Sequence, residues 1–254
     1  MDITRDPIHS DGWLADNYTV HSYEVDLTGR VTLPNLCRFM QEAAWKHAER
    51  LGVGFSFLIR EKLLWVLAQQ RIRIFQYSRM GATITIRTWP AGHDRRFYYR
   101  DFRLLDGDRE IGCATTAWSV IDLTTRRRST RELDFKISNP VTERVFSDKT
   151  PPLLALTATD WSNRLRVRYG DLDVNNHVNN VKYIEWILEG FERQFHQSND
   201  LGEITVNYLA EALYQDEIRL DHQSTAAGRY RHRLSNAVGG RELCRAETAW
   251  NGKT

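Results

Sequence analysis

Three segments in the first half of the chain alternate apolar and polar residues with a period of two. They are 82-ATITIRTW-89, 97-FYYRDFRLL-105 and 113-CATTAWSVID-122. β-Branched and aromatic residues recur on one face of each segment, as in a half-buried strand. The pattern therefore predicts that the three segments belong to one antiparallel sheet.

The preceding segment 33–52 has a helical period instead. Thr32 stands before it as a candidate N-cap and Gly52 follows as a stop signal. We expect one long helix, whose apolar stripe can be buried only against the concave face of its own sheet. The stripe consists of Leu36, Phe39, Met40, Ala43, Ala44 and His47.

The second half of the chain repeats this order of elements. Segment 110-EIGCATTAW-118 aligns with 242-ELCRAETAW-250, and both end in Thr-Ala-Trp. Such a match indicates an internal duplication. The predicted elements of the second copy are a strand over 164–171, a helix over 178–195, and strands near 203–213, 217–224, 229–236 and 241–250.

The predicted fold is therefore α+β, a tandem double hot-dog in which each repeat is a long helix wrapped by an antiparallel sheet. Arg, Ser, Thr and Pro are frequent between the copies, which indicates an extended connector. We expect an N-terminal repeat in residues 1–130, the connector in 131–163 and a C-terminal repeat in 164–254.

Composition narrows the functional classes. The 254 residues are 41% hydrophobic and 27% charged, with a formal net charge of +2. This mild charge and the absence of a recognition module give no reason to expect a nucleic-acid partner. The three cysteines form no CxxC pair and no metal-site spacing, and no segment is long and apolar enough for a membrane span. We expect a cytoplasmic protein with no metal and no membrane partner.

Residues 169–180, YGDLDVNNHVNN, carry the candidate chemistry. Asparagine is depleted in strands and helix interiors, so this segment is expected to be a turn before a helix. Strand alternation would place Asp171, Asp173 and Asn175 on one face, and His177 would continue that face into the first helical turn. Amides at the helix N-terminus would suit a developing oxyanion. The first copy has 25-VDLTGRVTLPN-35 there, with less reactive residues.

The segment DLDVNNHVNNVKYIEWILE resembles the signature of plant and bacterial acyl-acyl carrier protein (acyl-ACP) thioesterases. Their DxNxH pattern is carried here by Asp173, Asn175 and His177. Further segments resemble the first repeat of the family, so that the similarity covers most of residues 18–250. These segments are 65-WV-66, 72-IRI-74, 84-ITIRTW-89, 100-RDF-102 and 114-ATTAWSVIDLTTRR-127.

The resemblance also implies a carboxylate on the strand after the second helix, matched by Glu211. The family has a cysteine next, once considered a nucleophile, but this chain has Ala212. Alanine cannot attack a carbonyl, so a thiol nucleophile at this position is excluded. By itself, Glu211 between Leu209 and Leu213 would be interpreted as a charge that protects an edge strand. A lone histidine such as His177 would be interpreted as a surface or capping residue.

The resemblance implies hydrolysis of a fatty acyl-ACP thioester, which releases free fatty acid and holo-ACP and terminates fatty acid synthesis. Glu211 and His177 would activate water without a cofactor, Asn175 and helix amides would polarise the carbonyl, and Asp173 would orient a partner or balance charge. A covalent acyl-carboxylate intermediate is an open alternative. The first repeat would hold the acyl chain at Phe39, Met40 and Ala44, and ACP would contact Arg126, Arg127, Arg128 and Arg131.

Three other functions are compatible with this fold. An acyl-CoA thioesterase would share the chemistry and differ only in how the pantetheine carrier is recognised. A noncatalytic protein could bind acyl thioesters without cleaving them, although the intact set of four polar residues argues against it. A hot-dog dehydratase would lack the DxNxH pattern and build its site from two subunits. A fused pair of repeats makes a monomer viable, and a homodimer formed through sheet edges is also possible.

Overall fold

The computed structural model describes residues 12–135, 137, 140–148, 150 and 152–253. Their contacts divide the chain into two compact units. The first unit comprises the chain up to Val66 and Gln76–Ser147, and the second comprises Leu67–Phe75 and the chain from Asp148 onward. Among the helices of the described residues, none has the length and apolar character needed to cross a membrane.

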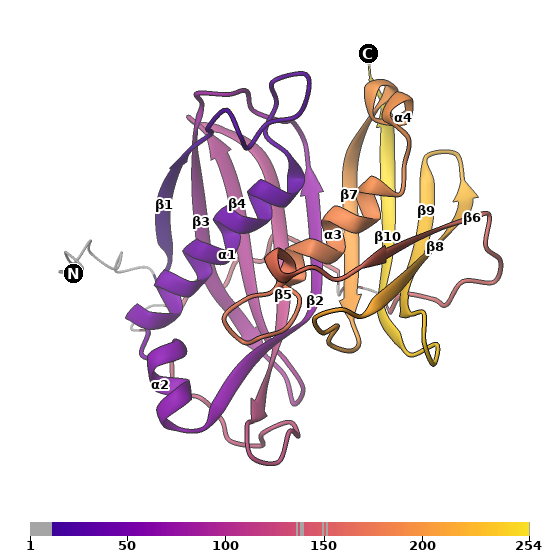
Figure 1. The fold of residues 1–254 in the computed structure, drawn as a ribbon. Helices are drawn as coiled ribbons and strands as arrows, with labels where there is room; N and C mark the ends of the chain where they lie inside the picture. The colour runs from indigo at the N-terminus through magenta and orange to yellow at the C-terminus, as the bar shows by residue number, and fades with distance from the viewer. Residues whose placement is uncertain (1–11, 136, 138–139, 149, 151, 254) are drawn as a thin grey trace. The chain divides into compact units, whose positions relative to one another are not determined.

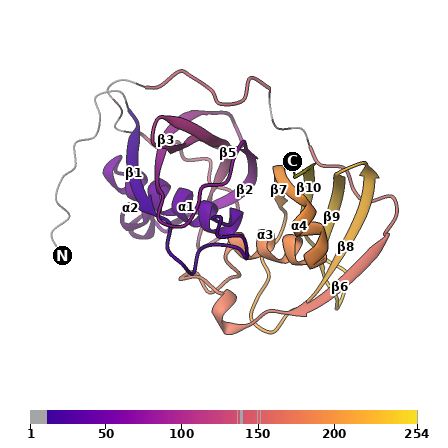
Figure 2. The same cartoon turned by 90° about the horizontal axis from the view of Figure 1, so that it is seen from above.

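The first unit contains a long helix against an antiparallel sheet (Figure 1). In this sheet β1 pairs with β3, β3 with β4, and β4 with β5. The strands curve around α1 (Figure 2). The elements from β1 to β5 are β1 (Leu14–Thr19), α1 (Leu33–Arg50), α2 (Phe55–Arg60), β2 (Leu63–Ile74), β3 (Thr83–His93), β4 (Tyr98–Asp106) and β5 (Arg109–Asp122). Only the first four residues of β2 belong to the first unit, and the rest belong to the second.

Helix α1 buries the predicted apolar stripe. Phe39 stacks on Tyr18 of β1 with ring centroids 4.8 Å apart. His47 is buried on the same stripe, where its Nδ1 lies 3.0 Å from the guanidinium of Arg100 on β4. Burial lowers the pKa of Arg100 to about 10, because a cation in the core loses its hydration. The core of this unit therefore contains a buried arginine–histidine contact among its apolar side chains.

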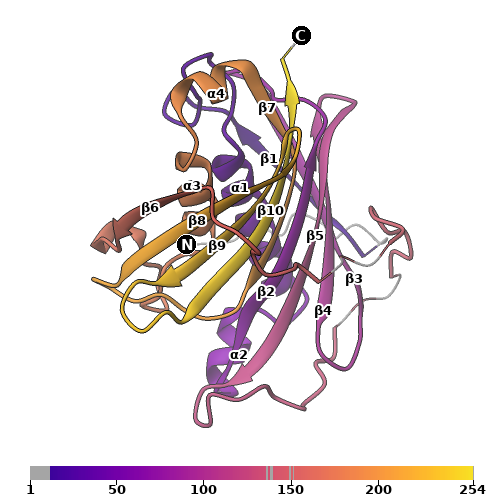
Figure 3. The same cartoon turned by 90° about the vertical axis from the view of Figure 1, so that its right-hand side faces the viewer.

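The second unit has the same architecture. Its strand β6 pairs with β8, β8 with β9, β9 with β10, and β10 with β7 (Figure 3). Residues 69–73 of β2 pair with β7. The elements are β6 (Trp161–Arg166), the 3-10 turn η1 (Tyr169–Asp171), α3 (Asn180–Glu189), α4 (Arg193–Ser198), β7 (Asn199–Tyr208), β8 (Glu217–Ala226), β9 (Arg229–Asn236) and β10 (Glu242–Gly252).

The pairing of strands follows one scheme in both units. Paired strands follow the order β1-β3-β4-β5 in the first unit and the corresponding order β6-β8-β9-β10 in the second. The two segments aligned by sequence, 110–118 and 242–250, lie in the last strand of each series. Each unit places a helix on one face of such a sheet. The predicted α+β tandem double hot-dog fold is confirmed.

Two predicted elements of the second repeat are wrong in extent. The helix expected over 178–195 is interrupted after α3, because Trp161 Nε1 donates to the Gly190 carbonyl oxygen at 2.9 Å and removes it from the helical ladder. The strand expected over 164–171 ends at Arg166. Beyond it, the Asp171 carboxylate accepts the Arg168 amide at 2.8 Å and closes the 3-10 turn.

The chain between β5 and β6 has no helix or strand among its described residues. A buried carboxylate on β4 holds one part of it. Asp101 accepts the Arg144 guanidinium at 2.9 Å and the Val145 amide at 3.0 Å. Trp89 Nε1 also donates to the Glu143 carbonyl oxygen. This part of the chain is therefore bound to the sheet of the first unit.

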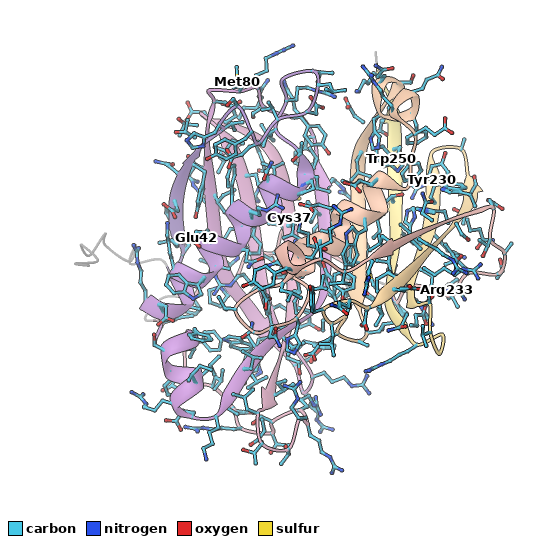
Figure 4. All side chains as sticks on the ribbon, in the orientation of Figure 1. Cys37, Glu42, Met80, Tyr230, Arg233 and Trp250 are labelled. Carbon is cyan, nitrogen blue, oxygen red and sulfur yellow. The ribbon has the colours of Figure 1, made fainter. Side chains whose placement is uncertain are left out.

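Aromatic rings and two histidines fill one end of the second unit (Figure 4). His222 Nδ1 and His232 Nδ1 lie 2.8 Å apart, and both side chains are buried. Burial lowers the pKa of His222 to about 4 and holds that of His232 well below its usual value. The rings around this pair belong to Trp161, Phe191, Phe195, Tyr230 and Trp250.

Candidate active site

The predicted polar motif forms a tight loop between η1 and α3. Leu172 and Val178 close the loop as a β-bridge, and the Asp173 amide donates to the His177 carbonyl oxygen at 2.9 Å. Asp173 Oδ1 accepts the Asn175 amide at 2.8 Å, an Asx turn that tightens the loop. Asn176 has a φ of 63°, a conformation that asparagine tolerates better than most residues. The loop is therefore encoded by its Asp and Asn residues.

His177 precedes the helix and is not part of its first turn. Helix α3 begins at Asn180, with Asn179 as N-cap, and the Asn179 side chain accepts the Val181 amide at 2.9 Å. The expectation that Asp171, Asp173, Asn175 and His177 share the face of a strand is wrong, because η1 and the Asx turn replace that strand. The expected turn before a helix is present, and the helix begins two residues later than predicted.

Glu211 lies in the loop between β7 and β8, beyond the strand on which it was expected. The Leu209 and Ala210 amides both donate to the Leu243 carbonyl oxygen, at 2.9 and 3.1 Å. Two consecutive amides on one acceptor break the alternation of a strand ladder. Strand β7 therefore ends at Tyr208, and Glu211 is not an edge-strand residue.

The two loops bring His177 and Glu211 together. The Val178 amide donates to the Ala212 carbonyl oxygen at 3.1 Å, so the residues before them are adjacent. His177 Nε2 lies 3.1 Å from Glu211 Oε2, with 17% of the histidine and 39% of the glutamate side chain exposed. The pair is therefore preorganised and open to a ligand.

Asn175 and Asp173 occupy the loop next to this pair. The Asn175 side-chain amide makes no hydrogen bond within the described part of the chain, so it is available to a bound carbonyl. Among the described residues, the Asp173 side chain makes one hydrogen bond, the one that forms the Asx turn. No ion pair joins Asp173 to His177 within the described residues. Asp171 is directed elsewhere, with Oδ1 3.4 Å from Lys182 Nζ on α3.

The first unit contains a loop with the same backbone. Val25 and Val31 close it as a β-bridge, and the Asp26 amide donates to the Arg30 carbonyl oxygen at 2.8 Å. Asp26 Oδ1 accepts the Thr28 amide at 2.8 Å, as Asp173 accepts that of Asn175. The aspartate is thus retained in a loop in which arginine replaces the histidine.

A second pair of residues takes the place of His177 and Glu211 in this loop. The Val31 amide donates to the Ser78 carbonyl oxygen at 2.9 Å, the counterpart of the bond from Val178 to Ala212. The residues before them are Arg30 and Tyr77, and the Arg30 guanidinium carbon lies 5.6 Å from the Tyr77 ring centroid. A cation over a phenol ring offers no general base at neutral pH. At these two loop positions, the second unit has a histidine–carboxylate pair and the first unit has an arginine and a tyrosine.

The cysteines do not take part in either loop. Cys37, Cys113 and Cys244 are all buried. Burial raises the pKa of the Cys244 thiol, which keeps it protonated and unreactive. Ala212, at the position of the family's cysteine, is fully buried. Among the described residues, no cluster of three His, Cys, Asp or Glu side chains could hold a metal ion.

The residues expected to hold an acyl chain lie on one face of α1. Phe39, Met40 and Ala44 are all buried there. Trp45 on the same helix, in contrast, is 48% exposed. The stripe therefore packs in the interior of the first unit.

The arginines expected to contact ACP fall into two environments. Arg126, Arg127 and Arg128 are exposed in the turn after β5, where the Arg128 guanidinium donates to the Arg95 carbonyl oxygen at 2.5 Å. Arg131 is paired with Glu61 at 2.6 Å. The charge of Arg131 is therefore already balanced.

Two tyrosines of this site were missed by the sequence analysis. Tyr183 on α3 and Tyr208 at the end of β7 both direct their hydroxyl groups to the backbone of the site loops. Their positions on apolar faces suggested core packing only. The available signal was the contrast with the first repeat, where Leu36 and Ile74 occupy the corresponding positions.

Two family models match nearly the whole chain. The N-terminal domain of acyl-ACP thioesterases matches residues 13–135, and the C-terminal domain matches residues 155–252. The chain belongs to the acyl-ACP thioesterase family. The family's two domains thus coincide with the two runs of elements, β1 to β5 and β6 to β10.

Individual members of the acyl-ACP thioesterase family are similar over most of the chain. The chloroplastic palmitoyl-acyl carrier protein thioesterase of Cuphea hookeriana is 28% identical over 93% of this chain and 62% of the relative. The oleoyl-acyl carrier protein thioesterase 2 of Arabidopsis thaliana is 32% identical over 80% of the chain and 60% of the relative. The chain thus spans about three fifths of the length of these two relatives.

A solved structure of the same family shows the fold. The acyl-ACP thioesterase of Bacteroides thetaiotaomicron superposes with a TM-score of 0.86 at 24% identity, covering 94% of this chain and 98% of that one. Agreement over almost the full length of both chains identifies the tandem arrangement as the fold of the acyl-ACP thioesterase family.

Proposed function

We propose that the protein hydrolyses the thioester of fatty acyl-ACP and releases a free fatty acid and holo-ACP. The observation that supports this most directly is the 3.1 Å contact between His177 Nε2 and Glu211 Oε2 beside the unpaired Asn175 amide. A base, its orienting carboxylate and a carbonyl-polarising donor are the groups that thioester hydrolysis requires. The names of the relatives, which are acyl-ACP thioesterases, supply the substrate class.

The proposed chemistry is attack by water on the thioester carbonyl carbon. Glu211 accepts the Nε2–H of His177, so the lone pair of the imidazole is on Nδ1 and takes a proton from water. The Asn175 amide stabilises the oxyanion of the tetrahedral intermediate. Cleavage of the C–S bond then expels the thiolate, and the imidazolium returns its proton to the sulfur. The products are a carboxylic acid and the carrier thiol.

The carrier is proposed to dock partly through Arg126, Arg127 and Arg128. Acyl carrier proteins are acidic, and an exposed run of arginines attracts an acidic partner and speeds encounter. Arg131 is left out of this surface because Glu61 neutralises it. The apolar face of α1 with Phe39, Met40 and Ala44 is proposed to receive the acyl chain.

Steady-state hydrolysis of acyl-ACPs from C8 to C18, compared with the matching acyl-CoAs, tests the proposal. We expect faster release from ACP and losses of about 100-fold or more in His177→Ala and Glu211→Ala. Glu192→Ala, which removes an exposed carboxylate in the same unit, is the matched control and should retain wild-type rates.

Three outcomes would count against this function. Equal or faster turnover of acyl-CoA would assign the protein to acyl-CoA hydrolysis. Full activity in the His177 and Glu211 variants would show that the chemistry occurs elsewhere. Tight binding of acyl thioesters without turnover by the folded wild-type protein would make it a binding protein.

A further inference from the structure

A tyrosine from the facing helix holds the loop that carries Glu211. Tyr183 on α3 is buried, and its hydroxyl oxygen accepts the Ala212 amide at 3.0 Å. The same hydroxyl lies 3.5 Å from the Ala210 carbonyl oxygen, which is long for a hydrogen bond, so the bond to Ala212 dominates. The hydroxyl therefore contacts the residues on both sides of Glu211.

A second tyrosine, at the end of β7, contacts the start of α3. The hydroxyl group of Tyr208, the last residue of β7, donates to the Asn180 carbonyl oxygen at 3.1 Å. The rings of Tyr183 and Tyr208 meet edge to face with centroids 5.6 Å apart. The start of α3 and the loop after β7 are thus joined by two phenols and by the backbone bond from Val178 to Ala212.

The first unit provides an internal comparison. It has the corresponding loops and the backbone bond from Val31 to Ser78, but Leu36 replaces Tyr183 and Ile74 replaces Tyr208. Both replacements are buried apolar side chains, so the loops form there without these two hydroxyl groups. At these two positions, hydroxyl groups are present only in the repeat that carries the histidine–carboxylate pair.

We propose that Tyr183 is a positioning residue for Glu211, an inference that rests on the proposed thioesterase function. Ala212 is fully buried, so its amide would lack a partner without the phenol and the loop would rearrange to find one. The flanking Glu211 would then move relative to His177. Displacements of about 1 Å in a catalytic group can cost about 100-fold in rate. Tyr183 acts through this geometry and does not touch the substrate.

The test is Tyr183→Phe, which keeps the ring and removes only the hydroxyl group. We expect kcat for acyl-ACP hydrolysis to fall about tenfold or more with KM changed less than about twofold, because only the position of Glu211 is affected. The matched control is Tyr98→Phe in the first unit, whose hydroxyl also accepts a backbone amide, that of Leu133, at 3.0 Å. Both variants should lose similar thermal stability, and only Tyr183→Phe should lose kcat.

The two proposals fail in different ways. If His177→Ala and Glu211→Ala are inactive but Tyr183→Phe is folded with wild-type kcat, only the positioning role is wrong. If the His177 and Glu211 variants remain active, the proposed function is wrong. If Tyr183→Phe does not fold, Tyr208→Phe replaces it in the test. We then expect kcat to fall while KM stays unchanged. Full activity of Tyr208→Phe would overturn the inference.

Discussion

The Val178 amide donates to the Ala212 carbonyl oxygen at 3.1 Å, although 33 residues separate the two in the chain. His177 and Glu211 are the residues immediately before them. This backbone hydrogen bond joins the two loops, and together with the hydrogen bonds of Tyr183 and Tyr208 it accompanies the 3.1 Å contact of the side chains. The same bond joins Val31 to Ser78 in the first unit, so the duplication preserved the scaffold and changed the side chains that it presents.

Asp173 is predicted to act through its hydrogen bond and not through its charge. Asp173→Asn keeps an Oδ1 acceptor for the Asn175 amide, so activity should stay within about threefold of wild type. Asp173→Ala removes the Asx turn and should lower kcat by about tenfold or more. Steady-state kinetics of the two variants would measure the difference.

Asp26→Ala is the control for this prediction. It removes the same turn from the loop of the first unit, which has no histidine–carboxylate pair, so it should cost stability but not kcat. An Asp173→Asn variant as inactive as Asp173→Ala would mean that the negative charge takes part in the chemistry.

Folding stability is predicted to fall as the pH is lowered from about 6.5 to about 4. Burial lowers the pKa of His222 to about 4 and that of His232 further, so the unfolded chain binds protons in this window and the folded chain does not. Each pH unit below the unfolded pKa then costs about 1.4 kcal/mol per histidine. Urea unfolding at pH 7 and pH 5 would measure the loss.

The double variant His222→Gln/His232→Gln should show a shallower pH dependence over the same range. Between about pH 6.5 and about pH 5 the window lies above the ordinary pKa of carboxylic acids, so the slope there reports mainly on histidines. An identical slope in wild type and double variant would show that this pair does not cause it.

Gly190→Ala is predicted to destabilise the second unit. A Cβ at this position would lie 2.1 Å from His222 Cε1, closer than any real contact. The imidazole is enclosed by aromatic rings and cannot move aside, so we expect a loss of about 2 kcal/mol or more in the free energy of unfolding. Gly170→Ala is the control, since nothing lies within 4 Å of its Cβ. Equal denaturation midpoints for the two variants would contradict the prediction.

Charge reversal of Arg126, Arg127 and Arg128 to glutamate is predicted to weaken recognition of ACP. At low ionic strength KM for acyl-ACP should rise by about tenfold with kcat unchanged, and the difference from wild type should shrink at about 0.5 M salt. Arg109→Glu is the control, because it changes one charge at the opposite end of β5. A triple variant with unaltered KM and salt dependence would place the docking surface elsewhere.

The sequence by itself determined the duplication, the long helix of the first repeat, most of the strands that follow it in each repeat, and the family. Each of these depends on local periodicity or on residues close together in the chain, which is why α1 and the strands β3, β4, β8 and β9 were predicted well. It also identified His177 and Glu211, the latter only through resemblance.

Only the tertiary structure decided how the site is held. Three features of the site come from contacts between distant segments. Strand β7 ends at Tyr208 where the chain contacts Leu243, and α3 breaks where the chain contacts Trp161. The hydroxyl group of Tyr183 accepts the amide of Ala212. Local propensity carries no information about such partners. Periodicity placed Glu211 on a strand and His177 in a helix, whereas the folded backbone places both in loops. Long-range hydrogen bonds to Leu243 end β7 before Glu211, and the local Asx turn and the Asn179 cap keep His177 out of α3.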